Sequence, residues 1–143
     1  MNASSMRFAR TASKLMRKFL AEPAYQRKTV INLGCGYDPL PFAYLAETNN
    51  VVFIDIDYPD LIQHKCKIIK DTPALSELIG LNSAETGSEI RTEKYDAIGC
   101  DLSDLTLVDK VLQTIEPNLK TSSILFISEV AITYMVRCFC TCI

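Results

Sequence analysis

The 143-residue sequence has no apolar run that reaches the roughly 18 residues of a membrane span. We therefore expect no membrane partner. The sequence has a single histidine, His64, and no set of residues that resembles a Ser-His-Asp arrangement. His64 falls in a predicted helix beside Lys65, where we expect it on the surface. The residues also offer no convincing metal-ligand cluster, so we expect no metal.

A secretory signal pattern is missing as well, although the sequence has six cysteines. Cys35, Cys66 and Cys100 are isolated within predicted helices and strands, where cysteine behaves as a small apolar residue. The other three alternate in "CFCTC" (138–142), with no partner cluster elsewhere. We expect a reducing compartment, the cytoplasm, rather than a disulfide framework.

Acidic residues are scarce near the start of the chain. Residues 1–28 hold seven Lys/Arg and one acid, whereas the remainder holds eight Lys/Arg and sixteen acids. Such a basic, amphipathic leader is typical of a mitochondrial transit peptide, which gives a mitochondrial alternative for localisation. The same leader fits a core-facing helix, because its apolar residues recur every three or four positions. These residues are Phe8, Ala12, Leu15, Met16, Phe19 and Leu20.

Strand-like and helix-like segments alternate through the rest of the chain, which predicts an α/β fold with a mostly parallel sheet in a three-layer sandwich. Predicted strands lie at 29–34, 51–57, 94–102 and 122–135, and predicted helices at 40–48, 58–72 and 103–117. A possible short helix opens a polar excursion at 72–93. Residues 30–33, 51–54 and 124–127 are nearly all apolar, which favours burial on both faces.

The predicted strands end in residues that are suited to ligand binding. The first ends in Gly34-Cys35-Gly36, the second in Asp55-Ile56-Asp57, the third in Asp101-Leu102 and the fourth in Glu129. Open α/β sheets bind ligands at the carboxyl ends of their strands, so we expect these residues at one edge. Glycines admit a ligand close to the backbone, and an acid after the second strand can bond ribose hydroxyls.

The glycine pattern disfavours a dinucleotide. The third glycine of G-x-G-x-x-G is replaced by Pro39, and Asp38 lies beside it, where a pyrophosphate would meet negative charge. S-adenosylmethionine has no phosphate and carries cationic groups, so the acidic edge suits it. Asp55 and Asp57 lie on the same side of a strand; we favour Asp57, which is nearer the strand's end.

Several of these residues have simpler interpretations. Asp101 fits a turn residue, and Asp104 fits a helix start. Arg10 could clamp a cofactor carboxylate or be one more charge on a solvated face. An unpaired interior carboxylate is costly, so Glu129 favours a role under the cofactor.

The ordered segments "VINLGCGYDPLPF", "VVFIDIDYPDL", "DAIGCDLSDL" and "ILFISEVAITYM" resemble the four signature segments of the leucine carboxyl methyltransferase-like family. "MRFARTASKLMRKFL" resembles the helix before them, so the resemblance covers nearly all of residues 6–135. "DIDYPDLIQHKCKIIKDTPALSELIG" looks closer to the wybutosine-synthesizing branch than to the phosphatase-methylating branch. The resemblance implies a Rossmann-like, S-adenosylmethionine-dependent methyltransferase.

In the wybutosine-synthesizing branch, the implied acceptor is the side-chain carboxylate of a hypermodified guanosine in phenylalanine tRNA. The alternative acceptor is a protein, the C-terminal leucine of a phosphatase catalytic subunit. A further alternative is that the chain is a non-catalytic fragment. The resemblance places Tyr134 near the acceptor. It implies cofactor contacts by Arg10, Gly34, Asp57, Asp101, Leu102 and Glu129, with Gly36 as the second glycine of the turn.

The sequence departs from the family near its end. Residues 1–135 are expected to form a partial methyltransferase domain, and "VRCFCTCI" (136–143) an aberrant Cys-rich tail. We expect a truncated or mis-spliced product, or an incorrect gene model, that lacks the C-terminal strands and most of the acceptor half. With strands in the order 3-2-1-4, the fourth would be an edge, which is an aggregation hazard. Only the leader offers basic charge for tRNA.

Overall fold

The structure, a computed structural model, describes residues 13–23, 27–82 and 87–128. Within these ranges one sheet contains β1 (Arg27–Leu33), β2 (Val51–Asp57), β3 (Ile90–Arg91), β4 (Tyr95–Gly99) and β5 (Ser122–Ser128). The helices are residues 13–21, α2 (Leu40–Leu45), α3 (Pro59–Lys70), α4 (Pro73–Ile79) and α5 (Leu105–Lys120). No helix of this part of the chain is long and apolar enough to cross a membrane.

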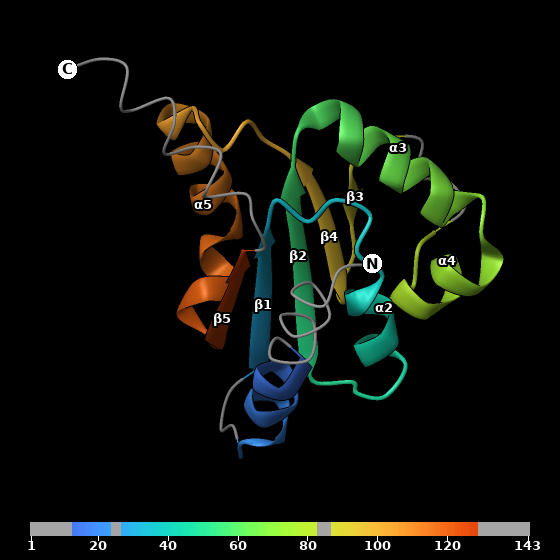
Figure 1. The fold of residues 1–143 in the computed structure, drawn as a ribbon, viewed down its shortest axis with the longest axis vertical. Coiled ribbons are helices and arrows are strands. Elements are labelled where there is room, and N and C mark those ends of the chain that lie inside the picture. Colours follow the sequence, from blue (N-terminus) through green and yellow to red (C-terminus); the bar gives the residue numbers. More distant parts are fainter. Residues whose placement is uncertain (1–12, 24–26, 83–86, 129–143) are drawn as a thin grey trace, which may run out of the picture.

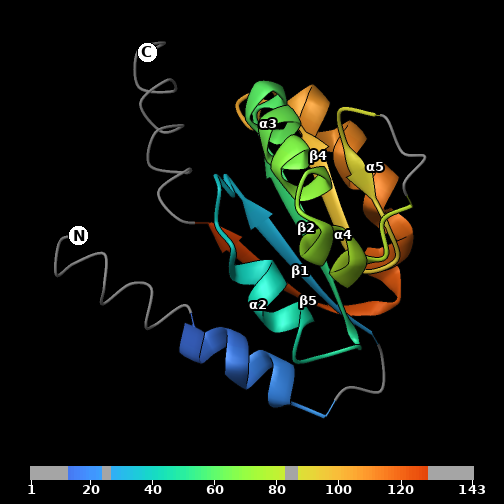
Figure 2. The ribbon, with the colours of Figure 1, turned by 90° about the vertical axis from the view of Figure 1, so that its right-hand side faces the viewer.

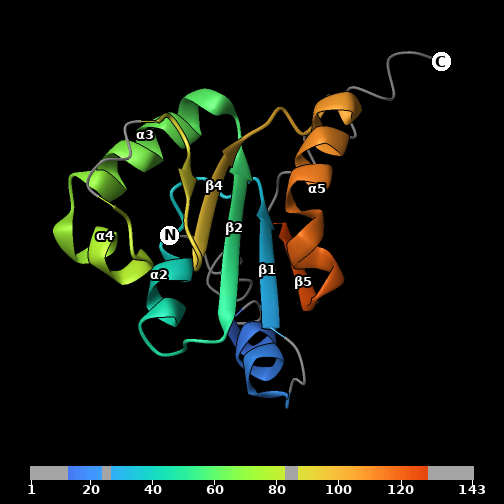
Figure 3. The same cartoon turned by 180° about the vertical axis from the view of Figure 1, so that it is seen from behind.

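The sheet is mostly parallel and its strands run in the order β3-β4-β2-β1-β5. Four of them, β4, β2, β1 and β5, are parallel and have the predicted 3-2-1-4 order, which confirms the expected topology. Helices α2, α3 and α4 lie on one side of the sheet and α5 on the other (Figures 1 and 3). The predicted α/β fold with three layers is therefore confirmed.

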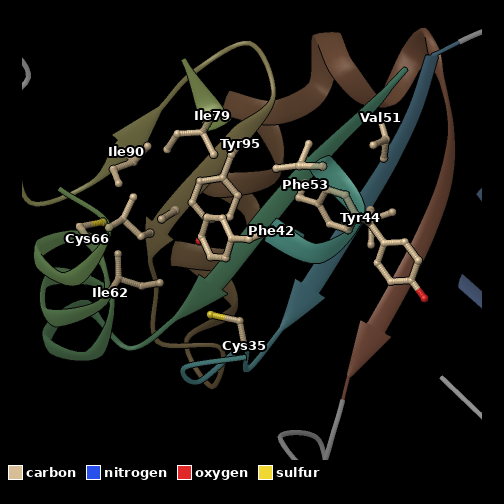
Figure 4. Close-up of a cluster of buried hydrophobic side chains, with 14 of the residues drawn as sticks. Cys35, Phe42, Tyr44, Val51, Phe53, Ile62, Cys66, Ile79, Ile90 and Tyr95 are labelled. Carbon is tan, nitrogen blue, oxygen red and sulfur yellow. The ribbon is translucent and has the colours of Figure 1, made fainter. Parts of the chain in front are cut away.

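Each face of the sheet carries its own apolar core. On one face, Phe42 of α2 packs beside Tyr95 of β4, with ring centroids 5.2 Å apart (Figure 4). On the other, Ile115 of α5 joins a cluster with Ile54 and Ile98. Because β1 and β2 lie between the two cores, residues 28–32 of β1 and all of β2 are buried, as the apolar runs at 30–33 and 51–54 predicted, although Leu33 is only partly buried.

The helix at residues 13–21 packs beside α2 (Figure 2), where Ser13 Oγ lies 3.1 Å from the Tyr44 hydroxyl oxygen. Met16 is completely buried, and Phe19 and Leu20 pack against the same core. The core-facing interpretation of this helix is confirmed for those residues. Leu15 is 57% exposed, so its expected burial is wrong. Two further residues of the predicted apolar stripe, Phe8 and Ala12, lie outside the described ranges.

Buried Lys28 ties that helix to the start of β1. Its ammonium donates to the backbone carbonyls of Leu20, at 2.6 Å, and Glu22, at 2.5 Å. It also lies 5.6 Å from the centroid of the Phe19 ring. A cation at the C-terminal end of a helix satisfies carbonyls that have no partner within the helix. The helix is therefore held by both apolar packing and charge.

Three sequence expectations need correction. The excursion at 72–93 contains β3, which pairs antiparallel with β4. The helix predicted to end at Pro117 continues to Lys120. Pro117 has no N–H for the carbonyl of Gln113 one turn earlier, but Gln113 is exposed, so water can reach that carbonyl. The run at 124–127 is not buried on both faces, because β5 is an edge of the described sheet and Phe126 is 55% exposed.

Candidate binding site at the strand ends

The connection after β1 (residues 34–39, here the glycine loop) lies at the carboxyl edge of the sheet (Figure 1). Gly34 and Gly36 have φ angles of 72° and 51°, which non-glycine residues rarely adopt. The Gly34 amide donates to the Ile56 carbonyl at 2.8 Å, so the loop is fixed to β2. A Cβ at Gly36 would meet nothing within 4 Å, so a ligand has room to approach the backbone there.

The Asp57 carboxylate lies directly beside the glycine loop. Its Oδ2 accepts from the Gly36 amide at 2.8 Å, and its Oδ1 accepts from the Tyr58 amide at 2.7 Å. The Asp57 carbonyl accepts from the Cys100 amide at 2.8 Å, which brings the end of β4 to the same place. The ends of β1, β2 and β4 are thus connected through one residue.

Asp101 and Leu102 follow β4 at this edge. Asp101 Oδ1 accepts from the Ser103 hydroxyl at 2.7 Å and from the Ser103 amide at 2.9 Å, so Asp101 forms the turn that the sequence allowed. The Ser103 hydroxyl and then its amide lower the pKa of the Asp101 carboxyl. Leu102 packs against the core beneath α5. Asp104 is the N-cap of α5, which confirms its interpretation as a helix start.

Three of the predicted site residues, Arg10, Glu129 and Tyr134, lie outside the described ranges. Residue 129 follows Ser128, the last residue of β5, and Ser128 is the register partner of Leu33 on β1. The last described residue of β5 is therefore level with the end of β1, the strand that leads into the glycine loop. Gly34, Gly36, Asp57 and Asp101 all gather at the edge where these strands end.

Asp55, unlike Asp57, points into the protein and is completely buried. Its Oδ2 accepts from the Lys65 ammonium at 2.6 Å and from the Tyr95 hydroxyl at 2.7 Å. Burial raises the pKa of Asp55, although Lys65 and Tyr95 act in the opposite direction. Burial would lower the pKa of Lys65, but the nearby Asp55 carboxylate and Cys35 raise it. The Asp55–Lys65 pair is an interior group beneath the loop.

Lys65 and Tyr95 were missed by the sequence analysis. Lys65 lies on the apolar stripe of α3, with Ile62, Cys66 and Ile69, and a charged residue at such a position needs a buried partner. That position was the available signal that Lys65 has a buried partner. The partner, Asp55, lies ten residues earlier, on β2. Tyr95 gave no comparable signal, since an aromatic residue in a strand usually signifies core.

Two surface hollows lie away from the strand ends, one along α3 and the other between the end of α4 and the β3–β4 connection. One, of about 620 Å³, is lined by residues that include His64, Lys67 and Lys70, and another, of about 560 Å³, by residues that include Arg91 and Lys94. His64 is exposed, as expected. Among the described residues no group of three or more His, Cys, Asp and Glu could hold a metal. The strand ends remain the candidate site.

The sheet order, with the glycine loop and the Asp57 carboxylate at the carboxyl ends of β1 and β2, defines a Rossmann-like α/β protein. The chain belongs to the leucine carboxyl methyltransferase family, whose model matches residues 2–138. This is the family that the signature segments resembled, and it is a family of methyltransferases.

The curated proteins similar to this chain include several fungal tRNA wybutosine-synthesizing proteins 4. The protein of Aspergillus fumigatus is 42% identical over 127 residues, which cover 84% of this chain and 12% of that protein. The protein of Aspergillus oryzae is 38% identical over 130 residues, which cover 86% of this chain and 12% of that protein. The protein of Schizosaccharomyces pombe is 39% identical over 127 residues, which cover 84% of this chain and 18% of that protein. The chain thus spans between 12% and 18% of the length of these three relatives.

Proposed function

We propose that this chain supplies the cofactor-binding part of an S-adenosylmethionine-dependent carboxyl methyltransferase. The observation that carries the proposal is the contact between Gly36 and Asp57 at the ends of β1 and β2. The glycine loop leaves backbone open to a ligand, and the Asp57 carboxylate lies where ribose hydroxyls would be bonded. Asp101 and Leu102 lie at the next strand end, in position to flank the adenine.

The glycine loop favours an adenosine ligand without phosphates. Asp38 Oδ1 accepts from the Leu40 amide at 3.0 Å, so a carboxylate already takes a donor at the start of α2. A pyrophosphate would compete with that carboxylate for the same amides and be repelled by it. S-adenosylmethionine instead brings cationic groups to an acidic edge. By the family resemblance, Arg10 would hold its carboxylate and Glu129 would lie under it.

The residues fit methyl transfer to a carboxylate. The bound cofactor would supply an electrophilic methyl group. A carboxylate acceptor is already ionised at pH 7, so the protein needs no general base to activate it. The glycine loop and Asp57 would fix one reactant, and burial of the site would strip water from both. Tyr134 is proposed, by the resemblance, to lie near the acceptor.

For the acceptor, we propose the side-chain carboxylate of the hypermodified guanosine of phenylalanine tRNA. The support is that the relatives cited above are tRNA wybutosine-synthesizing proteins and that the sequence around α3 resembles that branch. The description of the family model, leucine carboxyl methyltransferase, supports the alternative acceptor, a phosphatase C-terminal peptide.

Transfer of a radiolabelled methyl group separates the two acceptors. The chain is incubated with labelled S-adenosylmethionine and either hypomodified phenylalanine tRNA or the phosphatase peptide. Label on the tRNA that is released by mild alkali, as an ester would be, is the expected result. Label on the peptide would transfer the proposal to the protein acceptor. Cofactor binding without label on either would leave a binding fragment and contradict the catalytic part.

The role of Asp57 is tested by calorimetric titration with S-adenosylmethionine. Asp57→Ala should weaken binding by about 1–3 kcal/mol, the range for a hydrogen bond to a charged group. The control is Asp60→Ala, which removes an exposed acid from the first turn of α3. We expect wild-type affinity for the control. If Asp57→Ala binds as well as the wild type while folded, Asp57 is not a ligand residue.

A further inference from the structure

Lys65 makes two contacts that join different parts of the fold. Its ammonium lies 2.6 Å from Asp55 Oδ2 on β2 and 3.3 Å from the backbone carbonyl oxygen of Asp38 in the glycine loop. Lys65 itself is carried by α3 and is 4% exposed. One buried side chain therefore connects a helix, a central strand and the loop.

The Asp38 carbonyl is a position from which the whole loop can be held. The Asp38 amide donates to the Cys35 carbonyl at 3.1 Å, which closes a turn around Gly36. The Gly36 amide, inside that turn, donates to Asp57. Lys65 thus fixes the far end of the turn, while β2 fixes its beginning through the Gly34 amide. The position of the Gly36 amide depends on both ends.

Stability gives little reason for an ion pair at this place. A buried ion pair commonly stabilises a fold no more than apolar residues of the same volume would. Here the pair also leaves a cost, because Asp55 Oδ1 is buried with no hydrogen-bond partner among the described residues. The neighbours of Lys65 on α3, Ile62 and Ile69, are apolar, and an apolar residue would continue their stripe. What an apolar residue could not do is donate to the loop.

We propose that Lys65 is a positioning residue, which holds the glycine loop in its ligand-binding conformation from inside the protein. Asp55 fixes the ammonium from the opposite side. Positioning of the loop stands on these contacts alone. Its consequence for S-adenosylmethionine affinity rests on the proposed function.

The test compares neutral replacements of the pair in the full chain. Asp55→Asn/Lys65→Met removes both charges, so neither is left buried alone. Asp55→Asn/Lys65→Gln keeps a neutral hydrogen bond within the pair but shortens the side chain that reaches Asp38. The matched control is Tyr95→Phe, which removes the other donor to Asp55 and leaves the Asp38 contact in place.

Amide hydrogen exchange, measured by NMR without ligand, reads the loop directly. In both double variants the Gly36 and Asp38 amides should exchange about tenfold faster relative to β2 amides, as expected when one fixing hydrogen bond is lost. In Tyr95→Phe that ratio should stay at its wild-type value. Equal acceleration of loop and strand amides in the double variants would show a merely structural role and overturn the proposal. Failure of both double variants to fold would overturn it as well.

Titration with S-adenosylhomocysteine completes the experiment. Both double variants should bind it about tenfold more weakly than the wild type, with Tyr95→Phe unchanged. Unchanged affinity in the double variants, where the wild type binds, would overturn the link between Lys65 and the ligand. A wild-type chain that does not bind would count against the proposed function, and the exchange ratios would still decide whether Lys65 positions the loop.

Discussion

Asp55 and Asp57 are two residues apart on the same face of β2, yet the protein uses them in different ways. Asp55 is completely buried and pairs with a lysine, whereas Asp57 lies at the strand end and accepts two backbone amides. The sequence predicted that Asp57, nearer the end, would face a ligand. It could not reveal the partner of Asp55, because a pairing between a strand and a helix depends on packing rather than on local pattern.

Cys35 lies between the two glycines of the loop and is 4% exposed. Burial, and then the Asp55 carboxylate, raise the pKa of its thiol from 9.0 to about 12. The thiol is therefore protonated at neutral pH, and it behaves as the small apolar residue that the sequence indicated.

This raised pKa predicts a loss of stability in alkali. Between about pH 9 and pH 12 the unfolded chain releases the Cys35 proton while the folded chain keeps it, so the free energy of unfolding falls as pH rises. The slope from one such group is at most about 1.4 kcal/mol per pH unit. Urea unfolding of Cys35→Ala under reducing conditions should give a slope between pH 9 and 11 that is shallower by about 1 kcal/mol per pH unit.

Below pH 8 the wild-type and Cys35→Ala curves should run parallel, because the thiol is protonated in both states there. Identical slopes above pH 9 would contradict the raised pKa.

At the scale of elements, local signals predicted most of the fold. Pro59 begins α3 and Asp104 caps α5, accepting from the Thr106 amide at 2.9 Å and the Leu107 amide at 3.2 Å. β3 escaped prediction because two residues form a strand only when β4 lies beside them. In the site, the glycines and Asp57 carried recognisable spacing, whereas Lys65 acts through a tertiary contact that no spacing encodes.

The packing of α3 against β4 depends on one glycine. A Cβ at Gly99 would lie 3.0 Å from Pro59 Cα and 3.2 Å from Pro59 Cβ, which is tighter than most Cβ contacts, so Pro59 would have to shift by a few tenths of an ångström. Gly99→Ala should therefore push the start of α3 away and cost about 1–3 kcal/mol of unfolding free energy, as overpacking does. Chemical denaturation gives the value.

Gly87→Ala is the matched control for this substitution. Its Cβ would lie 3.7 Å from the Glu89 carbonyl oxygen, an ordinary contact, so we expect little change in stability. Equal losses in the two variants would argue against a specific clash with Pro59.

For the whole molecule, the described sheet has unequal edges. β3 is two residues long, but β5 has seven and pairs with β1 on one side. Its Phe126 is 55% exposed, and a long apolar edge of this kind can pair with another chain.

The boundary at residue 135 between methyltransferase domain and tail stays a prediction.

We expect the chain to associate as its concentration rises, and Phe126→Lys to shift it toward monomer, because a lysine on an edge strand opposes pairing. Sedimentation velocity over a range of concentrations measures the change. The control is Ile68→Lys, at a residue of α3 that is 52% exposed. If both variants reduce association equally, non-specific hydrophobic association rather than pairing at the edge of β5 is responsible.

The double grip on Asp57 has a consequence for how a ligand would be recognised. Each carboxylate oxygen already receives one amide and still has a lone pair for a further donor. A side chain clamped in this way has little rotational freedom to lose on association, so complex formation carries a small entropic penalty at that point. The ligand would meet a carboxylate that is held at a fixed distance from the Gly36 backbone. Selectivity would then depend on how well the ligand's donor groups match that distance, and not only on attraction between opposite charges.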